Sequence, residues 1–169
     1  FPTRRSSDLD AMNKGLALAT GDYVCFLNAG DCLHEDDTLE KMVHSMHQLE
    51  GLPDVLYGET EIVNKAGHFV RMRRLSAPEK LTWKSFQSGM LVCHQAFFAK
   101  RVLAEPYDLK YRFSSDFDWC VKIMKKSKRK DMGKFDLDKL EILAPAASHE
   151  LDSYNSRQNL KEYDFSKHD

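Results

Sequence analysis

The sequence predicts one mixed α/β domain, in which helices flank a sheet whose strands are largely buried. The segment 23–27 is an almost uninterrupted apolar run of strand length, which is typical of a strand covered on both faces, as in a parallel sheet. Segments with helical spacing of apolar residues, 10–19, 37–49 and 116–126, alternate with strand-like segments along the chain. The 169 residues are enough for one domain with its own hydrophobic core.

The first elements lead to a candidate site. Apolar residues at helical spacing predict a short helix from Asp10 to Ala19, and Gly21 suits the left-handed position just beyond its end. The buried strand 23–27 follows and stops at the polar turn Asn28–Asp31. Because ligands of α/β sheets gather beyond the carboxyl ends of the strands, this turn lies where a binding site is expected.

The rest of the chain continues the alternation. The segment 37–49 is the clearest helix, because its apolar residues form one stripe and Asp37 with Glu40 resembles a capping box. A polar strand at 68–75 is expected to pair as a hairpin with the strand before it. The other predicted elements are strands at 54–58, 61–63 and 141–144, an apolar segment at 91–99 and a helix at 116–126.

The two ends differ from the patterned middle. Residues 1–9 show neither helical nor strand periodicity and resemble the translation of a sequencing-adapter oligonucleotide, so we expect a non-native leader. The alternative is a natural N-terminus in which Ser6, Ser7 or Asp8 caps the helix. Residues 148–169 are polar and are expected to form a tail. The predicted domain therefore spans 10–147.

Composition excludes some partners. The net charge is −1, which favours neither nucleic acid nor an anionic membrane globally. One basic run, Lys122–Lys130, is either a solvated helix end or a patch that touches lipid headgroups or a phosphorylated acceptor. The four cysteines form no C-x-x-C pair, which indicates a reducing cytoplasm. No apolar run reaches the roughly 20 residues of a membrane-spanning helix.

Two pairs of polar residues are candidates for chemistry. Asn28 and Asp31 offer oxygen ligands for a hard cation at a strand end, although such a turn is more often only a turn. Asp116 and Asp118 offer carboxylates at a helix start, where Ser115 with Asp118 also fits a capping box. A histidine in an apolar stretch, such as His94, is more often a satisfied core residue than a catalytic group.

Three segments in order resemble a known family. The segment Asp10–Asp31 resembles the middle of a family-two glycosyltransferase with the GT-A fold, where a helix carrying Asn-x-Gly leads into a strand that ends in an Asp-x-Asp-type metal motif. Cys93–Phe98 and Tyr107–Trp119 resemble the family's acceptor-side segment and its Glu-Asp-type base motif. The likeness is greatest to bacterial enzymes of surface-polysaccharide synthesis. It implies a GT-A-like (Rossmann-like) mixed sheet that lacks its first strands in this chain.

The resemblance also implies roles and partners. It implies inverting transfer by single displacement, from a nucleotide-sugar donor to a glycan or lipid-linked acceptor, at the cytoplasmic face of a membrane, with a divalent cation (Mn²⁺ or Mg²⁺). The residues carried over are Asp10, Asn13 and Asn28 for the nucleotide sugar, Asn28 and Asp31 for the metal, Asp116 as base with Asp118 supporting it, and His94 with Gln95 for the acceptor.

The sequence departs from the family pattern at three places. An amide, Asn28, stands at the first carboxylate position of the metal motif, and Gly30 stands at its usual third position. Ser115 stands where many members carry Glu. The family's opening strand and its Asp-Gly-Ser-type turn do not occur before Asp10. We therefore expect this chain to bind nucleotide sugars weakly or not at all, and the strand at 23–27 to have a bare edge through which the chain self-associates.

Two alternatives remain open from the sequence. The chain could be a catalytically inactive fragment that acts as a binding module. It could instead be another nucleotide-sugar enzyme such as a nucleotidyltransferase, which would carry a glycine-rich basic loop after its first strand. No such loop occurs in this sequence.

Overall fold

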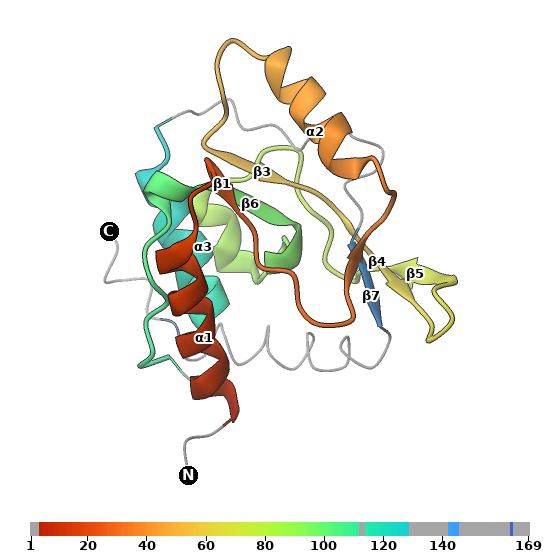
Figure 1. The fold of residues 1–169 in the computed structure, drawn as a ribbon, viewed down its shortest axis with the longest axis horizontal. Helices are drawn as coiled ribbons and strands as arrows, with labels where there is room; N and C mark the ends of the chain where they lie inside the picture. The colour runs from red at the N-terminus through yellow and green to blue at the C-terminus, as the bar shows by residue number, and fades with distance from the viewer. Residues whose placement is uncertain (1–3, 112–113, 129–141, 146–162, 164–169) are drawn as a thin grey trace.

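The computed structural model describes residues 4–111, 114–128, 142–145 and 163. Three α-helices, seven strands and three 3₁₀ helices occur in these ranges (Figure 1). In chain order the elements are α1 (Arg4–Leu18), β1 (Tyr23–Val24), β2 (Cys32–Leu33), α2 (Thr38–His47), β3 (Val55–Tyr57), β4 (Thr60–Val63), β5 (Phe69–Met72), η1 (Trp83–Ser88), η2 (His94–Ala96), β6 (Phe97–Lys100), η3 (Arg101–Leu103), α3 (Ser115–Lys126) and β7 (Ile142–Pro145).

The described strands form two small sheets rather than the single mixed sheet that was expected. One sheet has the order β1-β6-β3, with β6 antiparallel to both neighbours. The other has the order β2-β7-β4-β5, in which β4 and β7 are parallel and the remaining pairs are antiparallel. The mixed α/β class is thus confirmed, whereas a doubly covered parallel sheet around 23–27 is not observed.

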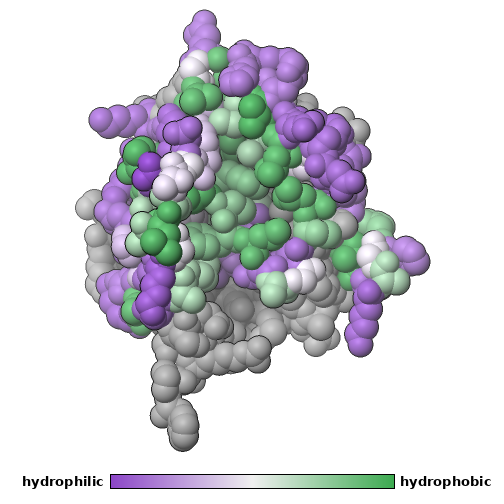
Figure 2. Space-filling view, in the orientation of Figure 1, coloured by the Kyte–Doolittle hydropathy of each residue, from purple (hydrophilic) through white to green (hydrophobic). Residues whose placement is uncertain are grey.

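The strand predicted at 23–27 is shorter than its apolar run. It pairs with β6 only through Tyr23 and Val24, opposite Lys100 and Ala99. Beyond Val24 the chain leaves the ladder, and the Leu27 side chain is 46% exposed. Among the described strands β6 is the one partner of β1. On the face of the molecule shown in Figure 2, apolar side chains gather between α1 and α2. Self-association through the edge of β1 stays a prediction.

Helix α1 begins earlier than the sequence pattern indicates. It starts at Arg4, within the residues expected to form a non-native leader, and Leu9 packs against the main core. The other half of the helix contacts the core through Met12 and Leu16. The predicted helix start at Asp10 was therefore wrong. Residues 4–9 extend the helix through its backbone hydrogen bonds, although their sequence lacks the apolar periodicity of a helix.

Helix α2 is also built differently from its prediction. Its buried side chains are Thr38, Met42 and Met46, a stripe narrower than expected, and the other apolar residues of the helix are about half exposed. The capping box of Asp37 with Glu40 does not form, since the Asp37 side chain makes no capping bond. Asp37 instead pairs with Lys41 at 2.9 Å.

The hairpin and the third helix agree with the sequence. Strands β4 and β5 pair antiparallel across a turn that contains Gly67, at φ 79°. Helix α3 spans 115–126 and buries its apolar face in the main core. Phe117 and Trp119 of this helix meet Phe86 of η1 and Phe97 of β6 edge-on.

The core also reaches into the segment expected to be a polar tail. Tyr163 is only 4% exposed, and its ring meets that of Phe117 edge-on with centroids 5.0 Å apart. Tyr163 therefore belongs to the core and corrects the prediction at this position. The rest of 148–169 lies outside the described residues.

Candidate active site

The turn 28–31 presents two oxygen-bearing side chains next to one another. The Asp31 backbone N–H donates to the Asn28 carbonyl at 3.0 Å, which closes the turn. Gly30 has φ 95°, a value that favours glycine at the third position of such turns. Asn28 is exposed and Asp31 is half-buried. Because the ends of a turn lie within about 7 Å, both side chains can face one ligand.

Gln95 holds the Asp31 carboxylate. Its side-chain N–H donates to Asp31 Oδ2 at 2.8 Å, and the glutamine itself is only 6% exposed. Two thiols hold the glutamine in turn: Cys93 donates to Gln95 Oε1 at 2.5 Å, and Cys25 donates to the Gln95 backbone carbonyl at 3.1 Å. A carboxylate that accepts from a buried, doubly anchored amide keeps one orientation.

His94, the neighbour of Gln95, contacts the second carboxylate. His94 Nδ1 lies 3.5 Å from Asp116 Oδ2, with the two side chains 14% and 38% exposed. His94 Nε2 is buried and has no hydrogen-bond partner within the described part of the chain. Asp116 lies in the first turn of α3. Its side chain contacts His94 and, at 38% exposed, is open to an incoming hydroxyl.

The 3₁₀ helix η2 thus links the candidate groups. Two consecutive residues, His94 and Gln95, contact Asp116 and Asp31, although the two aspartates are far apart in the sequence. A single site shared by the two aspartates stays a prediction. The structure brings these four residues into one chain of contacts, with Asn28 on the adjoining turn.

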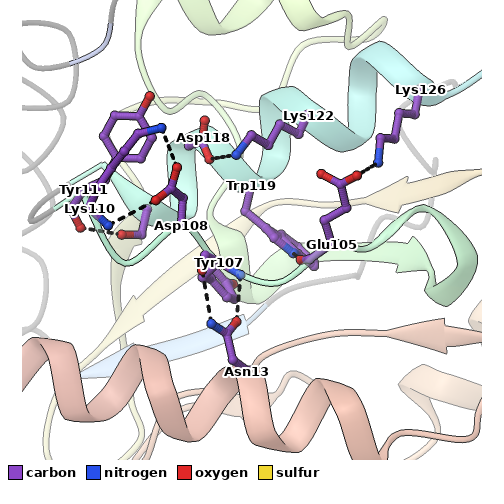
Figure 3. Close-up of polar contacts among 11 residues, drawn as sticks. Asn13, Glu105, Tyr107, Asp108, Lys110, Tyr111, Asp118, Trp119, Lys122 and Lys126 are labelled. Atoms are coloured by element: carbon purple, nitrogen blue, oxygen red, sulfur yellow. Dashed lines mark hydrogen bonds and ion pairs between the residues drawn. The ribbon is translucent and has the colours of Figure 1, made fainter.

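Asp118 is placed differently from Asp116. Its side chain is 2% exposed and pairs with Lys122 Nζ at 2.6 Å, one turn further along α3 (Figure 3). Residues two apart on a helix are about 200° apart, so Asp118 faces away from the His94 contact. The expected Ser115–Asp118 capping box is absent, because the Ser115 hydroxyl donates to the Tyr111 carbonyl at 2.7 Å. A contact through which Asp118 supports Asp116 is not observed.

Two of the three residues expected at the nucleotide sugar, Asn13 and Asp10, have other partners. The Asn13 amide donates to the Tyr107 carbonyl at 3.0 Å and accepts from the Tyr107 backbone N–H at 2.6 Å (Figure 3). These two bonds dock α1 onto the segment before α3. Asp10 is exposed and pairs with Lys14 at 2.7 Å. Contact of Asp10 and Asn13 with a nucleotide stays a prediction.

An aromatic cluster that the sequence analysis did not single out joins the segments of the site. Tyr107 and Trp119 stack with centroids 5.3 Å apart, and Phe26 meets both rings edge-on. The Trp119 indole N–H donates to the Glu105 carbonyl at 2.8 Å. Phe26 lies two residues before the turn and Trp119 three after Asp116, so the cluster sets the relative position of the two carboxylate segments. The sequence signal that could have indicated this cluster is the presence of an aromatic residue close to each motif.

The donor set is compatible with a hard cation but does not form a closed cage. Within the described ranges, no three His, Cys, Asp or Glu side chains converge as a metal site. Asn28 and Asp31 supply one amide and one carboxylate oxygen donor. Mg²⁺-type cations are commonly held by one or two carboxylates together with substrate phosphates, so these residues fit a cation shared with a diphosphate.

Comparison with known proteins identifies the family. The family Glycosyl transferase family 2 matches residues 5–105, so the chain belongs to this family of transferase enzymes. This assignment favours a glycosyltransferase over the nucleotidyltransferase alternative. The family match also begins inside the residues expected to be a leader. Whether residues 1–9 are native stays open to test.

Curated relatives agree with this assignment. The chain is similar to the PGL/p-HBAD biosynthesis glycosyltransferase of Mycobacterium tuberculosis, at 34% identity over 67% of the chain and 42% of the relative. It is also similar to the amylovoran biosynthesis glycosyltransferase AmsB of Erwinia amylovora, at 30% identity over 66% of the chain and 39% of the relative. The chain thus spans about two-fifths of the length of these relatives.

A second family overlaps the end of the chain. The Bacterial PH-like domain family matches residues 114–169, of which the structure describes α3, β7 and Tyr163. Helix α3 and Tyr163 pack into the same core as the family-two segment, so no boundary separates them in the described residues. None of the helices in those residues is long and apolar enough to cross a membrane.

Proposed function

We propose that the protein transfers a sugar from a nucleotide-sugar donor to a hydroxyl of a glycan or lipid-linked acceptor, with inversion at the anomeric carbon. The observation that carries the proposal is the contact of adjacent residues His94 and Gln95 with Asp116 and Asp31. A transferase of this kind needs a group near the leaving diphosphate and a base near the acceptor, and η2 links one candidate for each.

Asp116 is the proposed base. The acceptor oxygen attacks the anomeric carbon, the bond from that carbon to the diphosphate oxygen breaks, and the hydroxyl proton passes to the Asp116 carboxylate. The carboxylate is 38% exposed, which leaves room for an acceptor, and the neighbouring His94 holds one of its oxygens. We assign Asp118 a structural role, since its buried side chain is already paired with Lys122.

Asp31 and Asn28 are the proposed contacts to a divalent cation. When bound, Mn²⁺ or Mg²⁺ would neutralise charge on the departing diphosphate. Asp31 offers its carboxylate in an orientation that Gln95 defines, and Asn28 offers an exposed amide oxygen on the same turn. Gly30, at the third position of this turn, carries no side chain. The amide at position 28 leaves the turn with one negative charge fewer than an Asp-x-Asp motif.

The acceptor and the setting follow from the relatives. The mycobacterial relative is named for PGL/p-HBAD biosynthesis and the Erwinia relative for amylovoran biosynthesis. We infer an acceptor in bacterial surface-glycan or glycolipid synthesis, used at the cytoplasmic face of the membrane. The GT-A fold belongs to the same proposal, and the edge of β1 opposite β6 offers backbone groups that a further strand of such a sheet would pair with.

The test measures donor binding and transfer separately. Calorimetric titration with uridine- and guanosine-diphosphate sugars in Mn²⁺ reports donor binding, and labelled sugar incorporated into a bacterial lipid extract reports transfer. We expect Asp116→Asn to bind donor as the wild-type protein does, with transfer lost. Donor binding without transfer by wild type would favour the binding-module alternative. Absence of both activities would contradict the proposal.

A further inference from the structure

The β4–β5 hairpin carries an exposed apolar strand at the edge of its sheet. All four residues of β5 are exposed, including the large apolar side chains of Phe69 (58%), Val70 (50%) and Met72 (39%). The pairing shifts register between Ile62 and Val63, so Val70 is an extra residue in the ladder and has no partner on β4. The hairpin projects from one side of the molecule, away from α1 and α3 (Figure 1).

The same segment is strongly basic. Residues 64–78 contain Lys65, Arg71, Arg73 and Arg74 and neither Asp nor Glu. Arg73 is buried and donates to the Met90 carbonyl at 2.8 Å, so it anchors the segment to the body of the protein. The other three cations are exposed. Exposed apolar and cationic side chains on one projecting element are unusual on a surface that faces only water.

We propose that the β4–β5 hairpin is a docking surface for anionic phospholipid. Cations beside an anionic leaflet are stabilised by its surface potential, and Phe69, Val70 and Met72 supply the apolar area that enters the headgroup boundary. The buried Arg73 and the ladder to β4 keep the strand rigid, so little ordering is needed for insertion.

The charge of β5 favours anionic phospholipid over a second copy of the chain as the partner of this hairpin. Two β5 strands paired antiparallel about a two-fold axis would bring their Arg71 side chains directly or diagonally opposite, roughly 5–8 Å apart. Like charges in that arrangement repel, which is a common protection of edge strands against pairing. An anionic surface attracts the same cations, so the residues of β5 favour contact with lipid over pairing with a second β5 strand.

Docking by this hairpin is compatible with a lipid-linked acceptor. Strand β2 begins one residue after Asp31 and lies three strands from β5 in the same sheet. At strand spacing this is roughly 14 Å, so a docked hairpin keeps the Asp31 turn near the membrane surface. The docking inference does not depend on transfer, and vesicle binding can be measured without donor or acceptor.

The experiment is sedimentation of the full chain with vesicles of phosphatidylcholine alone and of phosphatidylcholine mixed with phosphatidylglycerol. We expect binding to the anionic vesicles only, and weaker binding as salt is raised. Lys65→Glu and Arg74→Glu should each lower the partition coefficient by at least about fivefold. Phe69→Ser should lower it roughly tenfold, because its exposed ring no longer leaves water.

Matched controls test whether the hairpin itself is responsible. Val102→Ser removes an apolar side chain that is 81% exposed on η3, and Lys126→Glu reverses a charge in the other basic run. Both should bind as wild type does. Phe69→Trp should bind and shift its fluorescence to the blue on anionic vesicles, which reports insertion without removing apolar area.

Four outcomes would overturn the proposal. They are no preference of wild type for anionic vesicles, undiminished binding by the hairpin variants, loss of binding in Lys126→Glu alone, and a light-scattering dimer that Phe69→Ser dissociates. Thermal unfolding of each variant, unchanged from wild type, would show that a loss of binding comes from the surface. If a serine or glutamate variant unfolds, the Phe69→Trp emission decides the matter.

Discussion

Replacing Gln95 tests whether a buried amide orients the candidate metal ligand. Gln95→Leu keeps the approximate volume of the side chain and removes the donor that lies 2.8 Å from Asp31 Oδ2. A hydrogen bond to a charged group contributes about 1.5–3 kcal/mol. Because Gln95 is only 6% exposed, water cannot readily replace the amide, and the carboxylate must then be ordered when the cation binds.

If that whole contribution is lost on binding, the affinity for Mn²⁺ falls about 10- to 150-fold. Loss of an outer-shell partner of a metal ligand commonly costs about 10- to 100-fold, so the two estimates agree. The assay is a titration of Mn²⁺ in the presence of uridine diphosphate, with free Mn²⁺ read by electron paramagnetic resonance.

Two further variants serve as controls for Gln95→Leu. Gln87→Leu removes an exposed glutamine of η1 and should leave Mn²⁺ affinity unchanged. Asp31→Asn should weaken binding at least as much as Gln95→Leu does. Equal affinity in Gln95→Leu and wild type would refute the orienting role of Gln95, and equal affinity in Asp31→Asn would remove Asp31 from the ligand set.

Three other predictions follow from the site and its surroundings. Asp116→Asn should lower transfer by about 10²–10⁴-fold with donor binding retained, measured as label incorporated per bound donor. In urea unfolding, Lys122→Met should cost about 3–5 kcal/mol because it leaves the Asp118 carboxylate buried without its cation, whereas Asp118→Asn should cost about 1–2 kcal/mol, since Lys122 can turn to water. Burial, reinforced by Cys93, raises the pKa of the Cys25 thiol to about 12, so iodoacetamide at mildly alkaline pH should modify exposed Cys32 well before Cys25. Because this native pKa lies above the ordinary value of 9.0, the contribution of Cys25 to stability is complete below pH 9 and declines as pH rises toward 12.

Much of the local structure could be predicted from neighbouring residues. The helix at 116–126 and the hairpin expected at 68–75 agree with the structure, because apolar periodicity and hairpin pairing depend on residues close together in the sequence. The ordered motifs around Asn28–Asp31, His94 and Asp116 were enough to predict the family, which the family match confirms.

Contacts between distant segments were decided only by the tertiary structure. The phase of α3 separates Asp116 from Asp118 by helical geometry alone, but only packing decides which of them lies beside His94 and which is buried. The bond from Gln95 to Asp31 joins residues 64 positions apart, and no local pattern encodes it.

The apolar run at 23–27 also shows that local sequence does not determine strand pairing. Its composition determined that the segment is apolar and extended, yet the ladder stops at Val24, because pairing depends on where β6 begins and on what Cys25 and Phe26 contact. Tyr163 lies in a polar stretch, and only its packing on Phe117 assigns it to the core. Local propensity is a property of adjacent residues, whereas burial and strand pairing are properties of the whole chain, which is why the sequence alone predicted the family and several elements, but only the tertiary structure decided which candidate residues come into contact.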